Sequence, residues 1–207
     1  MYAYHTKMYV NHTLLSLSEM KILEVFLDFQ KHYFAELVVT TKLTRPRTLR
    51  VLKELVKKDI LHVKKEANIK YYFLQKNSLV YSLLSSVEYN KKILFLEKKT
   101  TLKRALEMFK EKYESYIVMV LFGSIIKGYA SKMSDVDLLL IKEDFSEVQI
   151  KKIEDIADLV QGRTGLKISP YFMKIDEFKK KNELAKQVIE KHLVIEGGEL
   201  FLKMVIE

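Results

Sequence analysis

One segment in the second half of the chain restricts the fold and the chemistry more than any other. An apolar run of strand length ends in Gly123-Ser124. After ten intervening residues come Asp135 and Asp137, which are separated by one valine and lead into a second apolar run. Side chains at i and i+2 of a strand point to the same face, so the two carboxylates are expected to lie side by side. A small turn lets backbone N–H groups approach phosphates, and paired carboxylates bind Mg²⁺. The pattern predicts a pocket for a divalent cation and phosphates.

Composition narrows the class of protein. The 207 residues give room for one large or two small domains, and 48% hydrophobic with 30% charged residues is typical of globular chains. No run of about 18 apolar residues is present, so a membrane span is not expected. The first residues lack the apolar segment of a secretory signal. Without cysteine, disulfides and thiolate metal sites are excluded, and we expect a cytoplasmic protein.

The net charge of +9 is unevenly distributed along the chain. Residues 42–70 carry ten basic and three acidic side chains, a local charge of +7. A basic run is usually only a solvated face, but one this local is typical of a surface for an anionic partner. Because this run lies far from the paired carboxylates, the sequence predicts two modules.

The first module is expected to contain three helices and a hairpin. Ser18 is predicted to cap the first helix, residues 34–41 form the second, and Thr44 caps a third that has Pro46 in its first turn. The hairpin covers residues 60–74, with a polar centre at 64–68. The helix positions expected to face inward are Ile22, Leu23, Phe26 and Phe29 in the first helix and Leu49, Leu52 and Val56 in the third.

Three helices followed by a hairpin resemble a winged helix-turn-helix over about residues 14–77. The resemblance implies binding to double-stranded DNA, with the third helix in the major groove and the hairpin, or wing, on the backbone or minor groove. Winged helices also dock proteins, so this alternative stays open. The candidate DNA contacts are Arg45, Arg47, Thr48 and Arg50 in the helix and Lys64, Lys65 and Lys70 in the wing.

Residues 78–115 are expected to be helical almost throughout, with 78–100 as a helical linker. A helix pair that connects two domains often forms a homodimer contact, and packing within one domain is an equal alternative. We expect a homodimer. From residue 115 the pattern alternates between strands and helices, with one strand at 136–142 and a helix after Ser146. The expected domains are therefore 1–77, 78–100 and 101–207.

The segment from Leu121 to Leu139 resembles the signature of the polymerase-β-like nucleotidyltransferases, most closely their minimal, stand-alone branch, and the resemblance extends over 101–207. It implies an α+β fold with a mixed sheet flanked by helices. It further implies that Gly123 and Ser124 bind the phosphates of a nucleoside triphosphate. Asp135 and Asp137 would be the catalytic ligands of Mg²⁺. Lys127 stands where the family usually has arginine, and it keeps the charge without the bidentate fork.

One position departs from the family pattern. Counting back from Asp176-Glu177-Phe178 places Ser169 where the third carboxylate is expected, and serine cannot act as an ionised base. Asp176 or Glu177 could substitute, although a helix start there favours capping.

Two functions therefore remain open. One is transfer of a nucleoside monophosphate to a hydroxyl acceptor, coupled to DNA binding. The other is transcriptional regulation by a chain whose transferase domain only senses nucleotide or dimerises. The resemblance of some minimal members to antitoxins adds a small helical protein as an expected partner.

Overall fold

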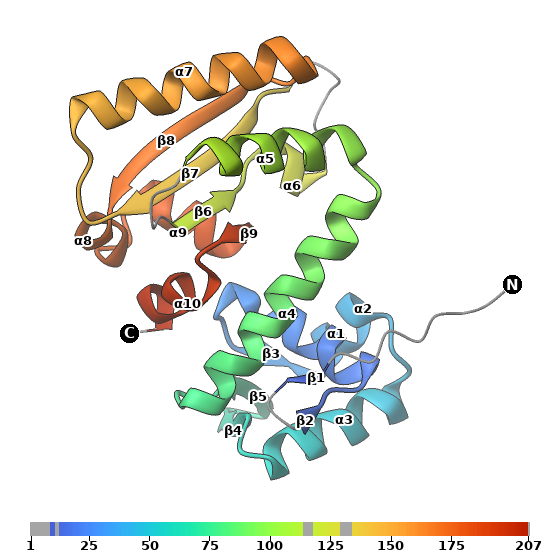
Figure 1. Cartoon of the computed structure of the whole chain (residues 1–207). Helices are drawn as coiled ribbons and strands as arrows, with labels where there is room; N and C mark the ends of the chain where they lie inside the picture. The colour runs from blue at the N-terminus through green and yellow to red at the C-terminus, as the bar shows by residue number, and fades with distance from the viewer. Residues whose placement is uncertain (1–8, 11–12, 114–117, 129–133, 207) are drawn as a thin grey trace, which may run out of the picture. The chain divides into compact units, whose positions relative to one another are not determined.

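The computed structural model describes residues 9–10, 13–113, 118–128 and 134–206. The chain divides into two compact units, the first ending at Val87 and the second beginning at Glu88 (Figure 1). Each unit combines helices with its own sheet, so the fold class is α+β, as predicted.

The first unit is a winged helix. Its three-stranded antiparallel sheet has the order β3-β5-β4, and three helices pack beside it. The predicted helices and hairpin are confirmed. β3 was not predicted, because two residues are too few to show a period. The elements are β1 (Tyr9–Val10), β2 (Thr13–Leu14), α1 (Leu17–Val25) with a 3₁₀ turn (Phe26–Asp28), β3 (His32–Tyr33), α2 (Phe34–Thr41), α3 (Arg45–Lys57), β4 (Leu61–Glu66), β5 (Ile69–Leu74) and the first part of α4 (Ser78–Glu97).

The cap of α1 is Ser16 and not the predicted Ser18. The Ser16 hydroxyl accepts a hydrogen bond from the Glu19 amide at 3.3 Å, and the Glu19 carboxylate accepts one from the Ser16 amide at 2.7 Å. This reciprocal capping box requires a glutamate three residues after the cap, which Ser18 does not have. Ser18 instead lies inside the helix, where its hydroxyl accepts a bond from Arg47 Nε at 2.9 Å.

The buried face of α3 also differs from the prediction. Leu49 is 42% exposed, whereas Thr48 is fully buried. Thr48 tolerates burial because its hydroxyl donates to the Thr44 carbonyl at 3.1 Å, one turn earlier in the helix. The inward face therefore follows the spacing i, i+3, i+4, i+7. It consists of Thr48, Val51, Leu52 and Leu55.

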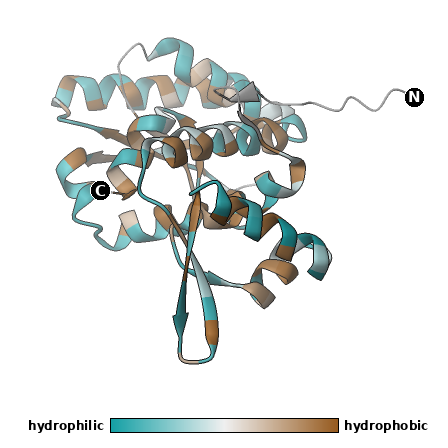
Figure 2. Cartoon of the chain, turned by 90° about the horizontal axis from the view of Figure 1, so that it is seen from below, coloured by the Kyte–Doolittle hydropathy of each residue, from teal (hydrophilic) through white to brown (hydrophobic). Residues whose placement is uncertain are grey.

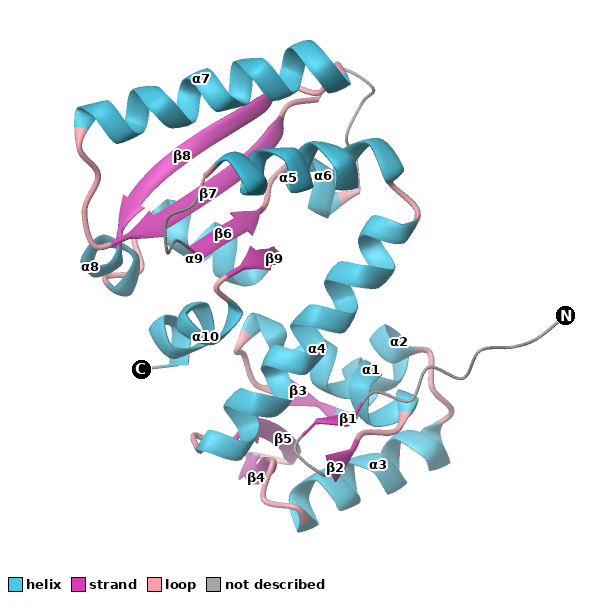
Figure 3. Ribbon diagram, in the orientation of Figure 1, coloured by secondary structure: helices cyan, strands magenta, loops and turns pink. Residues whose placement is uncertain are grey.

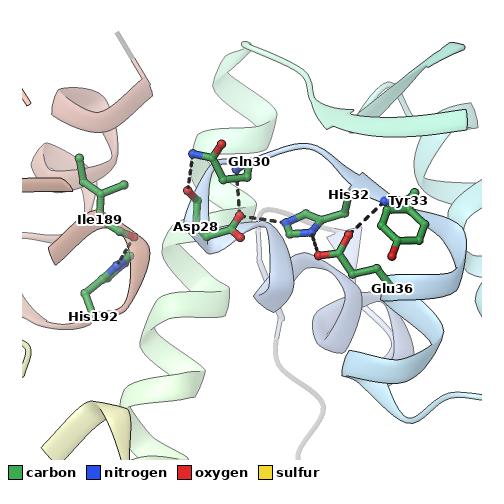
Figure 4. Close-up of polar contacts among 7 residues, drawn as sticks. All are labelled: Asp28, Gln30, His32, Tyr33, Glu36, Ile189 and His192. Carbon is green, nitrogen blue, oxygen red and sulfur yellow. Dashed lines mark hydrogen bonds and ion pairs between the residues drawn. The ribbon is translucent and has the colours of Figure 1, made fainter. Parts of the chain in front are cut away.

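A buried histidine ties the end of α1 to the start of α2 (Figure 4). His32 is 4% exposed; its Nε2 lies 2.9 Å from Asp28 Oδ1, and its Nδ1 lies 2.8 Å from Glu36 Oε1. Burial alone would lower the pKa of His32, but the hydrogen bonds and charges of the two carboxylates outweigh it and raise the pKa above its usual value. The imidazolium form is therefore stabilised in the folded unit.

We expect the stability of the first unit to fall as the pH rises. Because the pKa of His32 is higher in the folded than in the unfolded chain, its contribution is complete below the unfolded value of about 6.5 and is lost as the pH passes the folded value. Urea unfolding at a series of pH values from 6 to 9 measures this loss. In the variant His32→Gln the same fall should be smaller, and an unchanged pH profile in that variant would contradict the assignment.

The second unit contains a four-stranded mixed sheet of order β8-β7-β6-β9. β7 and β8 are parallel and the other neighbouring pairs are antiparallel, as the family resemblance implied (Figure 3). The elements after α4 are α5 (Thr100–Lys112), β6 (Val118–Leu121), α6 (Ser124–Lys127), β7 (Val136–Lys142), α7 (Glu147–Thr164), β8 (Ile168–Lys174), α8 (Ile175–Lys179), α9 (Glu183–Glu190), β9 (Leu193–Glu196) and α10 (Gly198–Ile206).

The core of the second unit defines the two faces of its sheet. α5 and α7 form one hydrophobic cluster with alternate residues of β7, namely Val136, Leu138 and Leu140. Side chains alternate between the faces of a strand, so the odd-numbered residues of β7 lie on the opposite face. The same rule places Ile168 of β8 in the cluster and Ser169 on the other face.

Polar contacts fix the second half of α4 to β9. Lys91 Nζ donates to the His192 carbonyl at 2.7 Å and Lys92 Nζ to the Ile195 carbonyl at 3.0 Å. Glu88 and His192 are both buried, with Glu88 Oε1 2.9 Å from His192 Nε2. Burial opposes ionisation of Glu88, but His192 and Lys91 hold its pKa below the usual range. This part of α4 is consequently an integral helix of the second unit.

Candidate active site and nucleic-acid interface

The end of β6 and the start of β7 bring the Gly123 turn against Asp137. Leu121 pairs with Leu138 in the antiparallel ladder, and the Phe122 amide donates to the Asp137 carbonyl at 3.1 Å. Gly123 has φ +76°, a conformation that favours glycine. A Cβ at this position would overlap the Asp137 carboxylate. The absence of a side chain at Gly123 is therefore what lets the carboxylate lie against the turn.

Asp135 and Asp137 lie on the face of the sheet opposite the α5–α7 cluster, as the spacing predicts. The charge of Asp135 acts on the neighbouring Asp137. Burial is the main cause that raises its pKa, and the charge of Asp135 adds to it. Two carboxylates that disfavour each other's ionised form are stabilised by a cation.

β8 and the residue directly before it complete the cluster with two donors. Ser169 pairs in register with Asp137, and its hydroxyl donates to Asp135 Oδ2 at 2.9 Å. Lys167 Nζ donates to the same oxygen at 2.7 Å. These bonds, that of Lys167 first, hold the pKa of Asp135 below its usual range. Position 169, where the family pattern has its third carboxylate, thus lies beside the two aspartates, and it is occupied by a serine.

Lys167 is the residue of this cluster that sequence reasoning missed. A signal for it was present, since Lys167 and Ser169 are spaced i, i+2 and must share a face if residue 168 is inward. What the sequence did not provide was the register that sets β8 beside β7.

The other sequence-predicted residues of this site lie nearby along the chain. Ser124 opens α6 and Lys127 ends it with an exposed side chain, directly after the Gly123 turn. Glu177 caps α8, because its Oε2 accepts a bond from the Lys174 amide at 3.2 Å. Capping is the role that its position at a helix start favoured.

The donors present fit a magnesium ion that shares its ligands with a nucleotide. Within the described residues, no group of three His, Cys, Asp or Glu side chains could hold a metal by itself. Mg²⁺, however, is usually bound by one or two carboxylates, with phosphates and water as its other ligands. Asp135 and Asp137 supply such a pair, with Asp137 against the Gly123 turn.

In the first unit, the four residues of α3 that were predicted to contact DNA differ in their exposure. Arg45 and Arg50 are exposed, and Arg45 lies over the Phe34 ring at 5.5 Å. Arg47 is half-buried and bonded to Ser18. Thr48 is fully buried, so it is removed from the candidate DNA contacts: its side chain belongs to the core.

The predicted wing residues are exposed basic side chains on the β4–β5 hairpin. Figure 2 shows this hairpin extending away from the helices of its unit. Lys64, Lys65 and Lys70 are all exposed, and Lys65 pairs directly opposite Lys70. Like charges at opposite positions destabilise a hairpin, so an anion placed between them would relieve the repulsion.

These features define a class of protein: a winged helix joined to a mixed-sheet domain with a Gly-Ser turn and paired carboxylates. Residues 102–195 match the family model described as "Nucleotidyltransferase domain". The second unit therefore carries a nucleotidyltransferase domain. No curated protein matches the chain. In the part of the chain that the structure describes, no helix has the length and apolarity to cross a membrane.

Two solved structures show a distant likeness. The adhesin competence repressor AdcR from Streptococcus pyogenes is 20% identical, with a TM-score of 0.35 over 47% of this chain and 70% of its own. The archaeal chromatin protein TrmBL2 is also 20% identical, with a TM-score of 0.29 over 81% of this chain and 73% of its own. At these TM-scores neither likeness identifies a fold or a function.

Proposed function

We propose that the chain is a Mg²⁺-dependent nucleotidyltransferase that transfers a nucleoside monophosphate from a triphosphate to a hydroxyl acceptor, and that its winged helix binds double-stranded DNA. The observation that carries the first part is the convergence of Asp135 and Asp137 beside the Gly123 turn. The match of residues 102–195 to the nucleotidyltransferase domain supports the same reaction.

In this proposal each residue has a defined task. The Gly123 turn and the Ser124 hydroxyl hold the β- and γ-phosphates, and Lys127 adds a point charge. Asp135 and Asp137 hold Mg²⁺, which supplies charge neutralisation at the phosphates. The acceptor oxygen attacks the α-phosphorus, the bond to the β-phosphate oxygen breaks, and pyrophosphate leaves with the electron pair. With serine at 169, the acceptor proton passes to solvent water.

The DNA-binding part rests on the exposed basic side chains of α3 and the wing. Arg45 and Arg50 project from the helix that enters the major groove in winged-helix proteins, and Lys64, Lys65 and Lys70 line the hairpin that touches the backbone. The homodimer and the small helical protein partner stay predictions from the sequence.

Incubation of the chain with each of the four α-labelled nucleoside triphosphates and Mg²⁺ tests the transfer. We expect label on the chain itself or on a co-purifying acceptor, and none when the metal is chelated. If the chain binds triphosphate but transfers no label to any acceptor, the proposed transferase activity is rejected.

A second function is favoured by one specific observation. Ser169 stands in place of the third carboxylate and bonds Asp135, so the cluster lacks a carboxylate base. A chain that binds but does not transfer a nucleotide would act as a nucleotide-sensing transcriptional regulator. Here the expected result is a DNA affinity that changes when triphosphate and Mg²⁺ are added, without any incorporation of label.

A further inference from the structure

Lys167 contacts Asp135, one of the two candidate metal ligands. Its ammonium and the Ser169 hydroxyl both donate to Oδ2 of Asp135, at 2.7 and 2.9 Å. Ser169 lies in β8 and Lys167 directly precedes that strand, two residues earlier, so the two residues share the face on which the two aspartates lie. One oxygen of Asp135 is therefore already engaged by a cation and a hydroxyl of the chain.

The engaged oxygen limits how many divalent cations the cluster can hold. In two-metal sites the ions lie about 3.5–4 Å apart. A carboxylate that bridges them by giving one oxygen to each ion uses both of its oxygens. Asp135 could bridge only if the Lys167 ammonium and the Ser169 hydroxyl both left Oδ2. The other oxygen of Asp135 and the carboxylate of Asp137 remain for one ion.

The charge of the cluster leads to the same limit. Two aspartates and Lys167 give a net charge of −1, whereas a third carboxylate at position 169 in the absence of the lysine would give −3. A second divalent cation is attracted much less strongly to the cluster of charge −1 than to one of charge −3, because Coulomb interactions between unit charges a few ångströms apart are strong. Lys167 supplies positive charge at the same place.

We propose that Lys167 takes the place of one divalent cation, so that the site accepts a single metal ion together with its triphosphate. This inference rests on the proposed function, since it concerns the same nucleotide site. Lys167 is then a positioning residue: it holds Asp135 in a single-metal arrangement and leaves Asp137 facing the Gly123 turn.

Mn²⁺ binding measured by electron paramagnetic resonance tests the inference. The full chain is titrated with Mn²⁺ in the presence of a non-hydrolysable triphosphate analogue, as wild type, Lys167→Met and the double variant Lys167→Met/Ser169→Asp. We expect one Mn²⁺ per chain in the wild type and about tenfold tighter Mn²⁺ binding in Lys167→Met. The double variant, with a third carboxylate and no lysine, is expected to bind two ions.

A lysine at the other end of β8 provides the matched control. Lys174 also pairs with an aspartate, Asp144, at 2.8 Å, and it has a similar exposure of 53% against 58% for Lys167. Lys174→Met should bind Mn²⁺ as the wild type does. Thermal unfolding of each variant establishes that it is folded.

Two outcomes would overturn the inference, and they are distinguishable. Two Mn²⁺ ions in the wild type, or unchanged Mn²⁺ affinity in Lys167→Met, reject the role of Lys167 while nucleotidyl transfer stands. If the wild type binds neither Mn²⁺ nor the analogue, the nucleotide site itself is rejected, and the single-metal inference with it.

Discussion

Replacing Asp137 by asparagine is expected to lower nucleotidyl transfer about a thousand-fold. Asparagine keeps the shape that fits against Gly123 and removes the negative charge beside the turn. A metal ion in such a site supplies several kcal/mol of charge stabilisation, and each 1.4 kcal/mol or so corresponds to a factor of ten in rate. Incorporation of labelled nucleotide measures the rate, and Mn²⁺ titration measures the accompanying loss of metal binding.

Asp144→Asn is the control for this substitution. Asp144 is 73% exposed and pairs with Lys174 away from the Asp135–Asp137 cluster, so its neutralisation should leave both measurements unchanged. Transfer at the wild-type rate by Asp137→Asn would exclude this carboxylate from the reaction. A wild type that binds Mn²⁺ but shows no transfer, with metal binding lost in Asp137→Asn, would instead favour the nucleotide-sensing regulator.

The double variant Arg45→Ala/Arg50→Ala is expected to weaken DNA binding about a hundred-fold at physiological salt. Both side chains are exposed on α3, and a hydrogen bond to a charged group contributes about 1.5–3 kcal/mol. If both contact phosphates, the slope of log K against log salt should also fall in magnitude by about 2. Fluorescence anisotropy with a duplex from the region upstream of the gene, over a range of salt concentrations, measures both quantities.

Lys151→Ala/Lys152→Ala serves as the charge-matched control, because these two exposed lysines lie on α7 in the second unit. It removes the same net charge and should retain nearly all of the DNA affinity. Equal binding by wild type and the arginine variant, on specific and scrambled duplexes alike, would mean that α3 is not the DNA-reading helix. The winged helix would then be better explained as a protein-docking module.

Features set by short-range sequence were predicted closely. α2 covers 34–41 and β7 covers 136–142, the ranges that the apolar pattern indicated. Thr44 precedes α3, with Pro46 in its first turn. In each case the signal lies within a few residues, where helix and strand periods, capping residues and proline act directly on the local backbone.

Features that depend on distant contacts were predicted less well. β3 exists because His32 and Tyr33 pair with Tyr72 and Tyr71, about forty residues away in sequence. The inward face of α3 was misplaced by one position, since α1 and α2 decide which side of the helix is covered. A period identifies a buried face only approximately when neighbouring positions are also apolar.

The sequence by itself determined the two modules, the Gly-Ser turn and the paired carboxylates, because the local spacing of those residues already sets their chemistry. Only the tertiary structure decided that Lys167 and Ser169 bond Asp135 and that Thr48 is buried. The physical reason is strand register and helix packing. Both depend on which distant surfaces meet. A shift of one residue would turn the side chains of a strand such as β8 to the other face of the sheet, and would rotate Thr48 by about 100° around the axis of α3.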